Sequence, residues 1–358
     1  MEITSQRELL RVSPTCELPE LAGLITSALA ETGPALSFGD VGTQSCPSNI
    51  CVVIATSGSS GLIKEVAFSS GALLASASAA NAFLGARIGS QWSLLLPITH
   101  IAGVNVIIRS MELGTLPVDL RDFDGEYPTV DFTSVVPTQL FRALNSDERL
   151  LRHLQSAQAV LVGGASLSPS LRLEAENAGV RIVETYGMTE TCGGCIYDGT
   201  PLTGVEFEIN EQGLIAIRGT VLASGYLNTP NLFNLHSGWF TTNDLGEIID
   251  EKLKVKGRAD DVIISGGENL SLIAVEATLS VRFPEIECAA FAVDDPHWGH
   301  ALHLAIVGDV SEMEISHYLE AALGGIAKPK GIHFVESLPL LGIGKIDRMA
   351  LTKMVRNE

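Results

Sequence analysis

The stretch Thr56-Ser57-Gly58-Ser59-Ser60-Gly61-Leu62-Ile63-Lys64 follows an apolar run at residues 50–55 that is typical of a buried strand. Its glycines let the backbone approach an anion closely, and its hydroxyl groups can donate further hydrogen bonds. Lys64 adds a compact positive charge. The spacing differs from that of a P-loop, which ends in Gly-Lys-Ser/Thr before a helix. The stretch therefore predicts a phosphate-binding loop after a strand; a flexible Ser/Gly turn is the alternative.

On both sides of this loop, the pattern of apolar residues predicts an α/β fold. Apolar runs that end in glycine, proline or polar residues alternate with helical segments, at residues 92–96, 134–136, 160–162 and 179–183. Such alternation is typical of parallel sheets, which bind ligands at the carboxyl ends of their strands. Helices are also expected at residues 18–29 and 71–84, and short antiparallel strands within residues 204–222.

Composition narrows the class of protein. The chain has 358 residues, 46% of them apolar, which suits two or three globular domains. A net charge of −19 argues against a nucleic-acid partner, which would need a basic face. The N-terminus has no pattern of a signal peptide, and residues 94–108, the most apolar stretch, are too few to cross a bilayer. We therefore expect a soluble, cytoplasmic protein without membrane insertion.

Two residues near residue 100 are candidates for contact with a ligand. His100 stands between a strand end and an apolar helical segment, where α/β folds place ligands, although a histidine bonded within the core is the commoner case. Arg109 lies among Val, Ile and Leu, so its charge needs a partner if it is buried. Either Arg109 pairs with a carboxylate of the protein or reaches solvent, or it binds the negative charge of an acidic substrate.

Two further stretches carry groups suited to a nucleotide. Tyr186-Gly187-Met188-Thr189-Glu190-Thr191 offers a ring to stack on a base, a hydroxyl for a phosphate and a carboxylate for Mg²⁺. In the stretch Gly238-Trp239-Phe240-Thr241-Thr242-Asn243-Asp244-Leu245-Gly246, Asp244 could accept hydrogen bonds from both hydroxyls of a ribose. The alternatives are a polar turn for the first stretch and a turn-capping aspartate for the second.

Cysteine and histidine spacing gives weaker signals. The six cysteines show no disulfide framework, and Cys192-Gly193-Gly194-Cys195 lacks the second pair that a zinc site would need. His297, His300 and His303 are three apart, but this spacing alone does not make a set of metal ligands. We therefore expect neither cluster to bind a metal.

In their order along the chain, these stretches resemble the motifs of the adenylate-forming superfamily of acyl-CoA ligases, luciferases and peptide-synthetase adenylation domains. The Tyr186 stretch matches the family's Tyr-Gly-x-Thr-Glu, and Gly344-Lys345-Ile346-Asp347-Arg348 matches its Gly-Lys-x-Asp-Arg. The phosphate loop departs from the family pattern at Ser60, at Ile63 in place of proline and at Glu65 in place of glycine. Glu65 would bring a negative charge near a triphosphate, so its side chain is expected to point away.

The resemblance implies a role for each matching residue. Lys345, His100 and Glu190 would be catalytic, Glu190 as the Mg²⁺ ligand, and Asp260 would be the hinge between domains. The acid would contact His100, Arg109, Gly163 and Gly164, and the CoA path would include Gly266, Gly267 and Glu268. ATP or AMP would be bound by Thr56, Ser57, Gly58, Ser59, Ser60, Gly61, Lys64, Gly164, Ala165, Tyr186, Gly187, Thr189, Asp244 and Arg258.

The same resemblance implies two domains: a large one at residues 1–258 with parallel α/β sheets, shortened relative to the family, and a small mobile α+β domain at residues 259–358. In the small domain, helices are expected at residues 272–282 and 312–323, and strands at 288–293 and 302–307.

The expected partners are ATP, CoA and an aromatic carboxylic acid. The sequence leaves the oligomeric state open, and a homodimer is one of the options. The short chain and the strings Val-Pro-Thr-Gln-Leu and Gly-Ile-Gly-Lys-Ile-Asp-Arg look most like the branch of the family that acts on o-succinylbenzoate in menaquinone biosynthesis. Another aryl- or acyl-CoA ligase, an adenylation module for a carrier protein, and a non-catalytic adenylate-binding protein are the alternatives.

Overall fold

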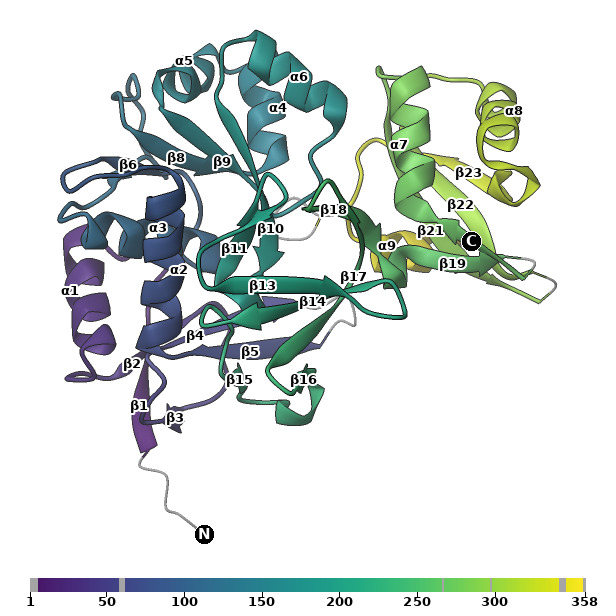
Figure 1. Ribbon diagram of the computed structural model, residues 1–358. Coiled ribbons are helices and arrows are strands. Elements are labelled where there is room, and N and C mark those ends of the chain that lie inside the picture. Colours follow the sequence, from purple (N-terminus) through teal and green to yellow (C-terminus); the bar gives the residue numbers. More distant parts are fainter. Residues whose placement is uncertain (1–5, 58–61, 266, 297, 341–345, 357–358) are drawn as a thin grey trace. The chain divides into compact units, whose positions relative to one another are not determined.

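The structure is a computed structural model that describes residues 6–57, 62–265, 267–296, 298–340 and 346–356 (Figure 1). The chain divides into two compact units. The large unit comprises Met1–Thr242 and Ile248–Lys254, and the small unit comprises Asn243–Glu247 and Val255–Glu358. Both units contain helices and sheets, as the α/β pattern predicted. The predicted domain boundary between residues 258 and 259 stays a prediction.

The first sheet of the large unit carries the hairpin that surrounds the phosphate-loop stretch. Its order is β15-β5-β4-β2-β1-β3. The middle strands β1, β2 and β4 pair in parallel, whereas β5 runs antiparallel to β4. The strands are β1 (Gln6–Arg11), β2 (Ala35–Phe38), β3 (Ser45–Pro47), β4 (Val52–Ser57), β5 (Ile63–Phe68) and β15 (Gly225–Tyr226).

The second sheet has the order β12-β11-β10-β9-β8-β6-β7. The strands from β10 to β7 are all parallel to their neighbours, and β11 is antiparallel to β10. The predicted parallel sheet is therefore confirmed at this place. The strands are β6 (Trp92–Leu94), β7 (Val118–Asp119), β8 (Phe132–Val135), β9 (Ala159–Val162), β10 (Ile182–Met188), β11 (Gly193–Tyr197) and β12 (Thr200–Pro201).

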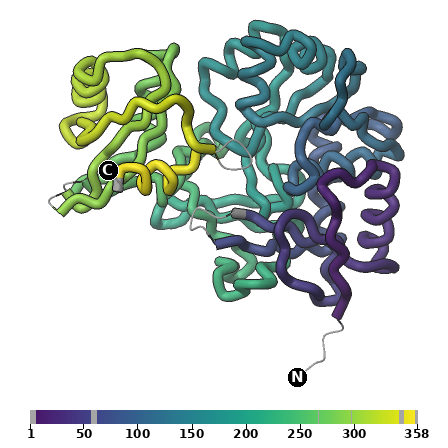
Figure 2. Tube along the Cα trace, turned by 180° about the vertical axis from the view of Figure 1, so that it is seen from behind, coloured from purple at the N-terminus to yellow at the C-terminus, as the bar shows by residue number. Residues whose placement is uncertain are grey.

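Helices cover both faces of the second sheet, because alternate residues of its buried strands point to opposite sides. In β9, Leu161 joins the core formed with α2 and α3, whereas Val160 and Val162 join the core formed with α4, α5 and α6. Figure 2 shows the chain from the opposite side. The helices are α1 (Leu18–Leu29), α2 (Ser70–Phe83), α3 (Ile101–Glu112), α4 (Pro137–Asn145), α5 (Glu148–Ser156) and α6 (Pro169–Asn177).

A third sheet has the order β13-β14-β17-β16, with β18 paired to β17. The predicted antiparallel strands within residues 204–222 are β13 (Val205–Ile209) and β14 (Leu214–Gly219). The other strands are β16 (Leu235–His236), β17 (Trp239–Ile249) and β18 (Lys252–Arg258), and short 3₁₀ turns are η1 (Thr189–Thr191) and η2 (Pro230–Leu232).

The small unit is a mixed sheet covered by helices. The sheet order is β20-β19-β22-β21, with β23 parallel to β22. The predicted helices are confirmed as α7 (Leu272–Arg282) and α8 (Glu312–Leu323), and the predicted strands lie within β21 (Glu287–Asp295) and β22 (Gly299–Val307). The remaining elements are η3 (Ala259–Asp261), β19 (Val262–Ser265), β20 (Glu268–Ser271), η4 (Gly325–Ala327), β23 (Gly331–Phe334) and α9 (Arg348–Arg356).

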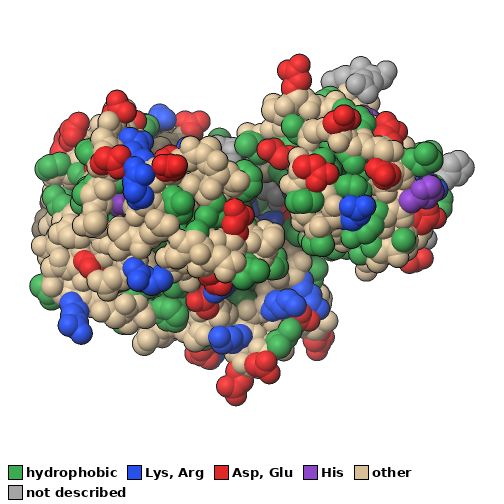
Figure 3. Space-filling view, turned by 90° about the horizontal axis from the view of Figure 1, so that it is seen from above, with side chains coloured by type: hydrophobic (Ala, Val, Ile, Leu, Met, Phe, Trp, Pro, Cys, Tyr) green, Lys and Arg blue, Asp and Glu red, His purple; other side chains and the backbone are tan. Residues whose placement is uncertain are grey.

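The surface carries charges of both signs. On the face seen in Figure 3, acidic and basic side chains are interspersed. Among the described residues, no helix combines the length and the apolar character needed to cross a bilayer.

Candidate active site

The β4–β5 hairpin places two predicted phosphate ligands opposite each other. Thr56 pairs with Lys64, and Ser57 with Ile63, at the end of the antiparallel ladder. Gly58, Ser59, Ser60 and Gly61, which connect the two strands, lie outside the described residues. The register therefore brings Thr56 and Lys64 to the base of the connection that the sequence predicted to bind phosphates.

The Glu65 side chain is directed away from this connection, as expected. Glu65 is 4% exposed, and its Oε1 accepts hydrogen bonds from the backbone N–H groups of Gly42 (2.7 Å) and Thr43 (3.3 Å). Its Oε2 accepts a hydrogen bond from the Thr43 hydroxyl. Because neighbouring residues of a strand point to opposite faces, this leaves Lys64 on the other side of β5. The glutamate thus anchors the Gly42–Thr43 turn and does not face the predicted phosphate site.

On its own face of the hairpin, Lys64 belongs to a chain of polar contacts. Its Nζ lies 3.4 Å from the Tyr226 hydroxyl, which in turn donates to Glu190 Oε1 at 2.6 Å. The predicted phosphate-binding lysine and the predicted metal ligand are therefore linked through Tyr226. Sequence reasoning missed this tyrosine, because the two residues of β15 are too short to show a periodic pattern.

The turn that carries Thr189 and Glu190 is held by hydrogen bonds at several points. It begins where β10 ends, and the Thr191 hydroxyl accepts from the N–H of Met188 at 2.9 Å. Gly187 has to be a glycine, since a Cβ there would lie 2.1 Å from the backbone oxygen of Gly193. The predicted nucleotide residues thus follow one another at the carboxyl end of β10: Tyr186 and Gly187 lie in the last part of the strand, and Thr189 and Glu190 lie in η1.

Neighbouring strands bring further predicted residues to the same edge of the second sheet. Gly163, Gly164 and Ala165 follow β9, and His100 is the N-cap of α3, the helix after β6. A Cβ on Gly163 would lie 2.2 Å from the Thr185 hydroxyl oxygen, so close packing of this turn on β10 requires glycine. Because β10, β9, β8 and β6 are adjacent and parallel, their carboxyl ends share one edge.

Arg109 lies at the other end of α3 and is 4% exposed. Its Nη2 donates to the Tyr197 hydroxyl at 3.1 Å, and its guanidinium lies 5.3 Å from the centre of the Trp92 ring. Among the described residues, no carboxylate forms an ion pair with it, and its buried Nε has no hydrogen-bond partner. Arg109 is thus a buried cation whose charge no carboxylate of the described chain compensates.

The structure does not bring Arg109 and His100 to one point. Arg109 comes nine positions after His100, which corresponds to roughly 13 Å along α3 at 1.5 Å per residue. Between them, Asn105 donates to the backbone oxygen of Cys192 at 2.5 Å, while Asn105 Oδ1 and Trp92 Nε1 lack partners among the described residues. An acid that reaches both Arg109 and His100 would therefore have to extend along α3.

In the small unit, the two predicted ribose ligands lie together. Arg258 Nη1 is 3.5 Å from Asp244 Oδ1, and the same guanidinium makes two hydrogen bonds of 2.8 Å to the carboxylate of Asp260. The predicted hinge residue is thus tied to one of the ribose ligands through a bidentate contact.

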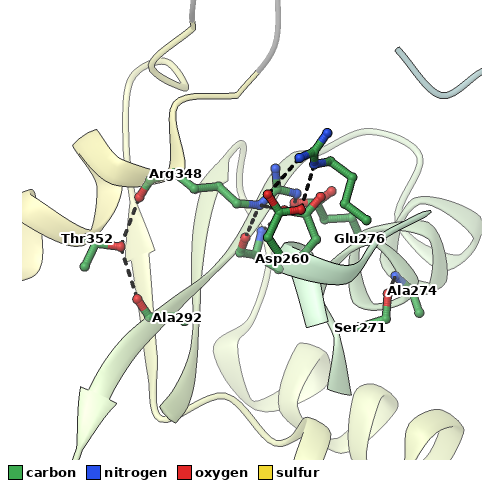
Figure 4. A network of polar contacts seen from close by, with 10 residues as sticks. Asp260, Ser271, Ala274, Glu276, Ala292, Arg348 and Thr352 are labelled. Atoms are coloured by element: carbon green, nitrogen blue, oxygen red, sulfur yellow. Dashed lines mark hydrogen bonds and ion pairs between the residues drawn. The ribbon is translucent and has the colours of Figure 1, made fainter. Parts of the chain in front are cut away.

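Lys345 lies outside the described residues, but the chain on both sides of it is fixed. Leu340 and Ile346 form an antiparallel bridge, and the N–H of Asp347 donates to the backbone oxygen of Pro339 at 2.8 Å. Arg348 donates to the backbone oxygen of Ala290 at 2.9 Å and to Glu276 at 2.7 Å (Figure 4). The predicted catalytic lysine is therefore three residues from an anchored arginine.

The predicted CoA-path residues fall at the turn between β19 and β20. Gly266 lies outside the described residues, and Gly267 has a φ of 87°, which favours glycine. Glu268 opens β20 and pairs with Ser265.

The cysteine pair and the spaced histidines are the residues with the weaker metal signals. Burial raises the pKa of Cys195 to about 12 and that of Cys192 well above its usual range, which makes both thiols poor metal ligands or nucleophiles. His303 contacts His333 at 3.0 Å, whereas His297 lies outside the described residues. Across the described ranges, no group of three or more His, Cys, Asp or Glu could hold a metal ion.

Two family models match this chain, and known proteins resemble it over most of its length. Residues 19–227 match the family described as AMP-binding enzyme, and residues 275–345 match the AMP-binding enzyme C-terminal domain. A probable 2-succinylbenzoate–CoA ligase of Mycobacterium tuberculosis is 38% identical over 332 residues, which cover 87% of this chain and 86% of that protein.

Two solved structures from Bacillus subtilis have the same fold. One is o-succinylbenzoate CoA synthetase in complex with the acyl-adenylate intermediate OSB-AMP; it is 25% identical, with a TM-score of 0.77 over 96% of this chain and 78% of that one. The other is the synthetase in complex with ATP and magnesium ion, 24% identical, with a TM-score of 0.75 over 95% of this chain and 82% of that one.

Proposed function

The chain belongs to the family of AMP-binding enzymes, and on that premise we propose that it is an ATP-dependent acid–CoA ligase whose acid is o-succinylbenzoate. The observation that carries the proposal is the similarity to a probable 2-succinylbenzoate–CoA ligase over nearly the whole of both chains. The product would be o-succinylbenzoyl-CoA, an intermediate of menaquinone biosynthesis, formed together with AMP and pyrophosphate.

The reaction would proceed in two half-reactions. In the first, an oxygen of the substrate carboxylate attacks the α-phosphorus of ATP, and the bond to the β-phosphate oxygen breaks to release pyrophosphate. In the second, the sulfur of CoA attacks the carbonyl carbon of the acyl-AMP, AMP leaves, and the thiol proton goes to solvent. The small domain would turn about Asp260 between the two steps.

In the first half-reaction, the residues that match the family motifs would contact the nucleotide. Lys64 and the hairpin connection would bind the β- and γ-phosphates, Tyr186 would lie against the adenine, and Asp244 with Arg258 would hold the ribose. Lys345 would contact the carboxylate and the α-phosphate, where charge develops in the transition state.

The environment of Glu190 fits a magnesium ion that is bound mainly by phosphates. Its Oε1 accepts from Tyr226, but its Oε2 has no hydrogen-bond partner among the described residues. Mg²⁺ in nucleotide sites usually takes one or two carboxylates and completes its shell with phosphate oxygens and water. The ion would neutralise phosphate charge during attack, and the single carboxylate of Glu190 would orient it.

Arg109 would recognise the second carboxylate of the dianionic acid. The reacting carboxylate has to lie near the nucleotide at the strand edge, and Arg109 lies two to three turns along α3 from there. Its compensating anion is absent from the described residues, and its neighbours Asn105 and Trp92 leave buried polar atoms unpaired. Buried polar atoms normally have partners, so these support a polar ligand or bound water beside Arg109.

The function is tested by measuring AMP release with a panel of aromatic and aliphatic acids, with and without CoA. Release of AMP that needs both o-succinylbenzoate and CoA supports the proposal. A preference for another acid would make the protein a different aryl- or acyl-CoA ligase. Transfer only to a carrier protein would indicate an adenylation module, and no turnover with any acid would indicate a non-catalytic binder.

Replacing Arg109 by alanine is expected to raise the KM for o-succinylbenzoate by about 10- to 150-fold, because a hydrogen bond to a charged group contributes about 1.5–3 kcal/mol. The KM for ATP should barely change, and a monocarboxylate analogue should respond little. Arg109→Lys should recover only part of the loss, because lysine cannot form two parallel hydrogen bonds to a carboxylate.

Tyr197→Phe is the matched control for this substitution, since it removes the contact with Arg109 at 3.1 Å and keeps the guanidinium. If Arg109→Ala discriminates between the dicarboxylate and the monocarboxylate as well as the parent does, Arg109 is a structural residue.

We also propose the cytoplasm as the compartment, because ATP and CoA are available there. All six cysteines are unpaired, as is usual in a reducing environment. A homodimer stays a prediction.

A further inference from the structure

Tyr226 lies between two residues that come from distant parts of the chain. Its hydroxyl is 3.4 Å from Lys64 Nζ and 2.6 Å from Glu190 Oε1, and its side chain is only 4% exposed. Lys64 Nζ also lies 4.9 Å from the centre of the Tyr226 ring. A single buried hydroxyl therefore contacts both the predicted phosphate-binding cation and the predicted metal-binding carboxylate.

The backbone fixes where this hydroxyl can be. Gly225 pairs with Ala67 and Tyr226 with Val66, so β15 extends the sheet that carries the hairpin. On either side of the tyrosine, the N–H of Ser224 donates to the backbone oxygen of Ala67 at 2.8 Å. The N–H of Leu227 donates to the backbone oxygen of Glu65 at 2.9 Å. The position of Tyr226 is thus tied to the strand that carries Lys64.

Aromatic packing fixes the direction of the ring. Phe233 meets the Tyr226 ring edge-on, with centroids 5.2 Å apart, and is itself stacked on Phe240 at 4.9 Å. The tyrosine ring therefore has little rotational freedom, and its hydroxyl stays directed at Glu190 and Lys64.

The count of protons fixes the direction of each hydrogen bond. A phenol has one proton, and an ionised carboxylate can only accept, so the Tyr226 proton lies toward Glu190. A tyrosine phenol is protonated near neutral pH, because its ordinary pKa is about 10. The lone pairs of the same oxygen then accept from Lys64, whose ammonium group has only donors.

We propose that Tyr226 is a positioning residue that holds the Glu190 carboxylate for the metal of the metal–nucleotide complex and keeps Lys64 beside it. The inference rests on the proposed function. With Oε1 bound to Tyr226, Glu190 offers Oε2 to the ion in a fixed orientation. Groups that orient a metal ligand through a hydrogen bond typically contribute 10- to 100-fold to metal affinity.

The test compares Tyr226→Phe with the parent by titrating Mn²⁺ in the presence of an ATP analogue that cannot be cleaved between the α- and β-phosphates. Mn²⁺ takes the oxygen ligands that Mg²⁺ takes and is observed directly by electron paramagnetic resonance. Phenylalanine keeps the ring and its contact with Phe233, so only the hydroxyl is lost. We expect Mn²⁺ binding to weaken by about 10- to 100-fold.

In the adenylation assay, the same variant should need a correspondingly higher concentration of Mg²⁺ for half-maximal rate. Its kcat at saturating Mg²⁺ should stay within a few-fold of the parent value. Tyr127→Phe is the matched control, because Tyr127 also accepts a hydrogen bond from a cation, Arg149 at 3.1 Å, and has its ring beneath that cation. That control should bind Mn²⁺ like the parent.

A double-mutant cycle separates positioning from a general loss of structure. If Tyr226 acts through Glu190, then Tyr226→Phe should have almost no further effect on Mn²⁺ binding in a Glu190→Gln background. Equal losses in both backgrounds would show that the tyrosine acts elsewhere, and equal affinities of Tyr226→Phe and parent would also overturn the inference. If the parent itself binds no Mn²⁺ with the analogue, the proposed function fails as well, so the two failures are distinguishable.

Discussion

Replacement of Lys345 by alanine is expected to slow adenylate formation by about 10²–10³-fold, because it removes one charge contact made in the transition state. Thioester formation from supplied acyl-AMP should stay near the parent rate, since that half-reaction does not use this lysine in the proposed mechanism. The two rates are measured separately, by pyrophosphate release in the absence of CoA and by thioester formation from purified acyl-AMP.

The control for this variant is Lys353→Ala, an exposed lysine on α9 of the same unit. It removes the same charge from the small unit and should change neither rate. If Lys345→Ala slows both half-reactions equally, the lysine is needed throughout, and the account of two conformations fails.

The second large effect is expected from Asp260→Pro, which should allow adenylate formation and block transfer to CoA. Asp260 lies in the 3₁₀ turn η3, and 3₁₀ geometry uses a φ near the value of about −65° that proline imposes. Proline should therefore fit the backbone of this turn, whereas a hinge has to change φ and ψ between steps. Single-turnover experiments should show acyl-AMP accumulating to one equivalent.

Asp260→Ala separates the hinge from the carboxylate. It also removes the two 2.8 Å hydrogen bonds with Arg258, but it leaves φ free to change. We expect it to turn over faster than the proline variant. Unimpaired overall turnover of Asp260→Pro would place the hinge at another residue.

The elements that sequence analysis predicted best are those whose pattern is local. Residues 18–29, 272–282 and 312–323 form helices with the predicted bounds, because an apolar face repeats within each segment. The strand β15 could not be predicted, since its two residues gain their structure only by pairing with β5, far away in sequence. Its pairing depends on tertiary contacts that no local pattern records.

The residues of the candidate site also differ in how far the sequence predicted them. The strand ends that carry His100, Gly163 and Glu190 follow from the alternation of strands and helices, because parallel strands share one carboxyl edge. The roles of these residues came from resemblance to a family and stay proposals. The contacts of Tyr226 and of Glu65 join residues that are far apart in sequence; Glu65 and Gly42, for example, are 23 residues apart. Sequence reasoning therefore missed Tyr226, and for Glu65 it predicted the direction of the side chain but not its partners.

The Glu65 anchor has a consequence for engineering by family consensus. Replacing an unusual residue by the commonest one in a family often stabilises a protein, and consensus would put glycine at position 65. Here that change would leave the N–H groups of Gly42 and Thr43 and the Thr43 hydroxyl without their acceptor, next to a newly empty volume. Gly42 is exposed and Thr43 is half-buried, so water can replace part of the lost hydrogen bonds, and the destabilisation should fall below the roughly 1–3 kcal/mol per group typical of fully buried groups left unpaired. Glu65 and the Gly42–Thr43 turn are therefore a matched pair, and a hairpin grafted between relatives should carry both or neither.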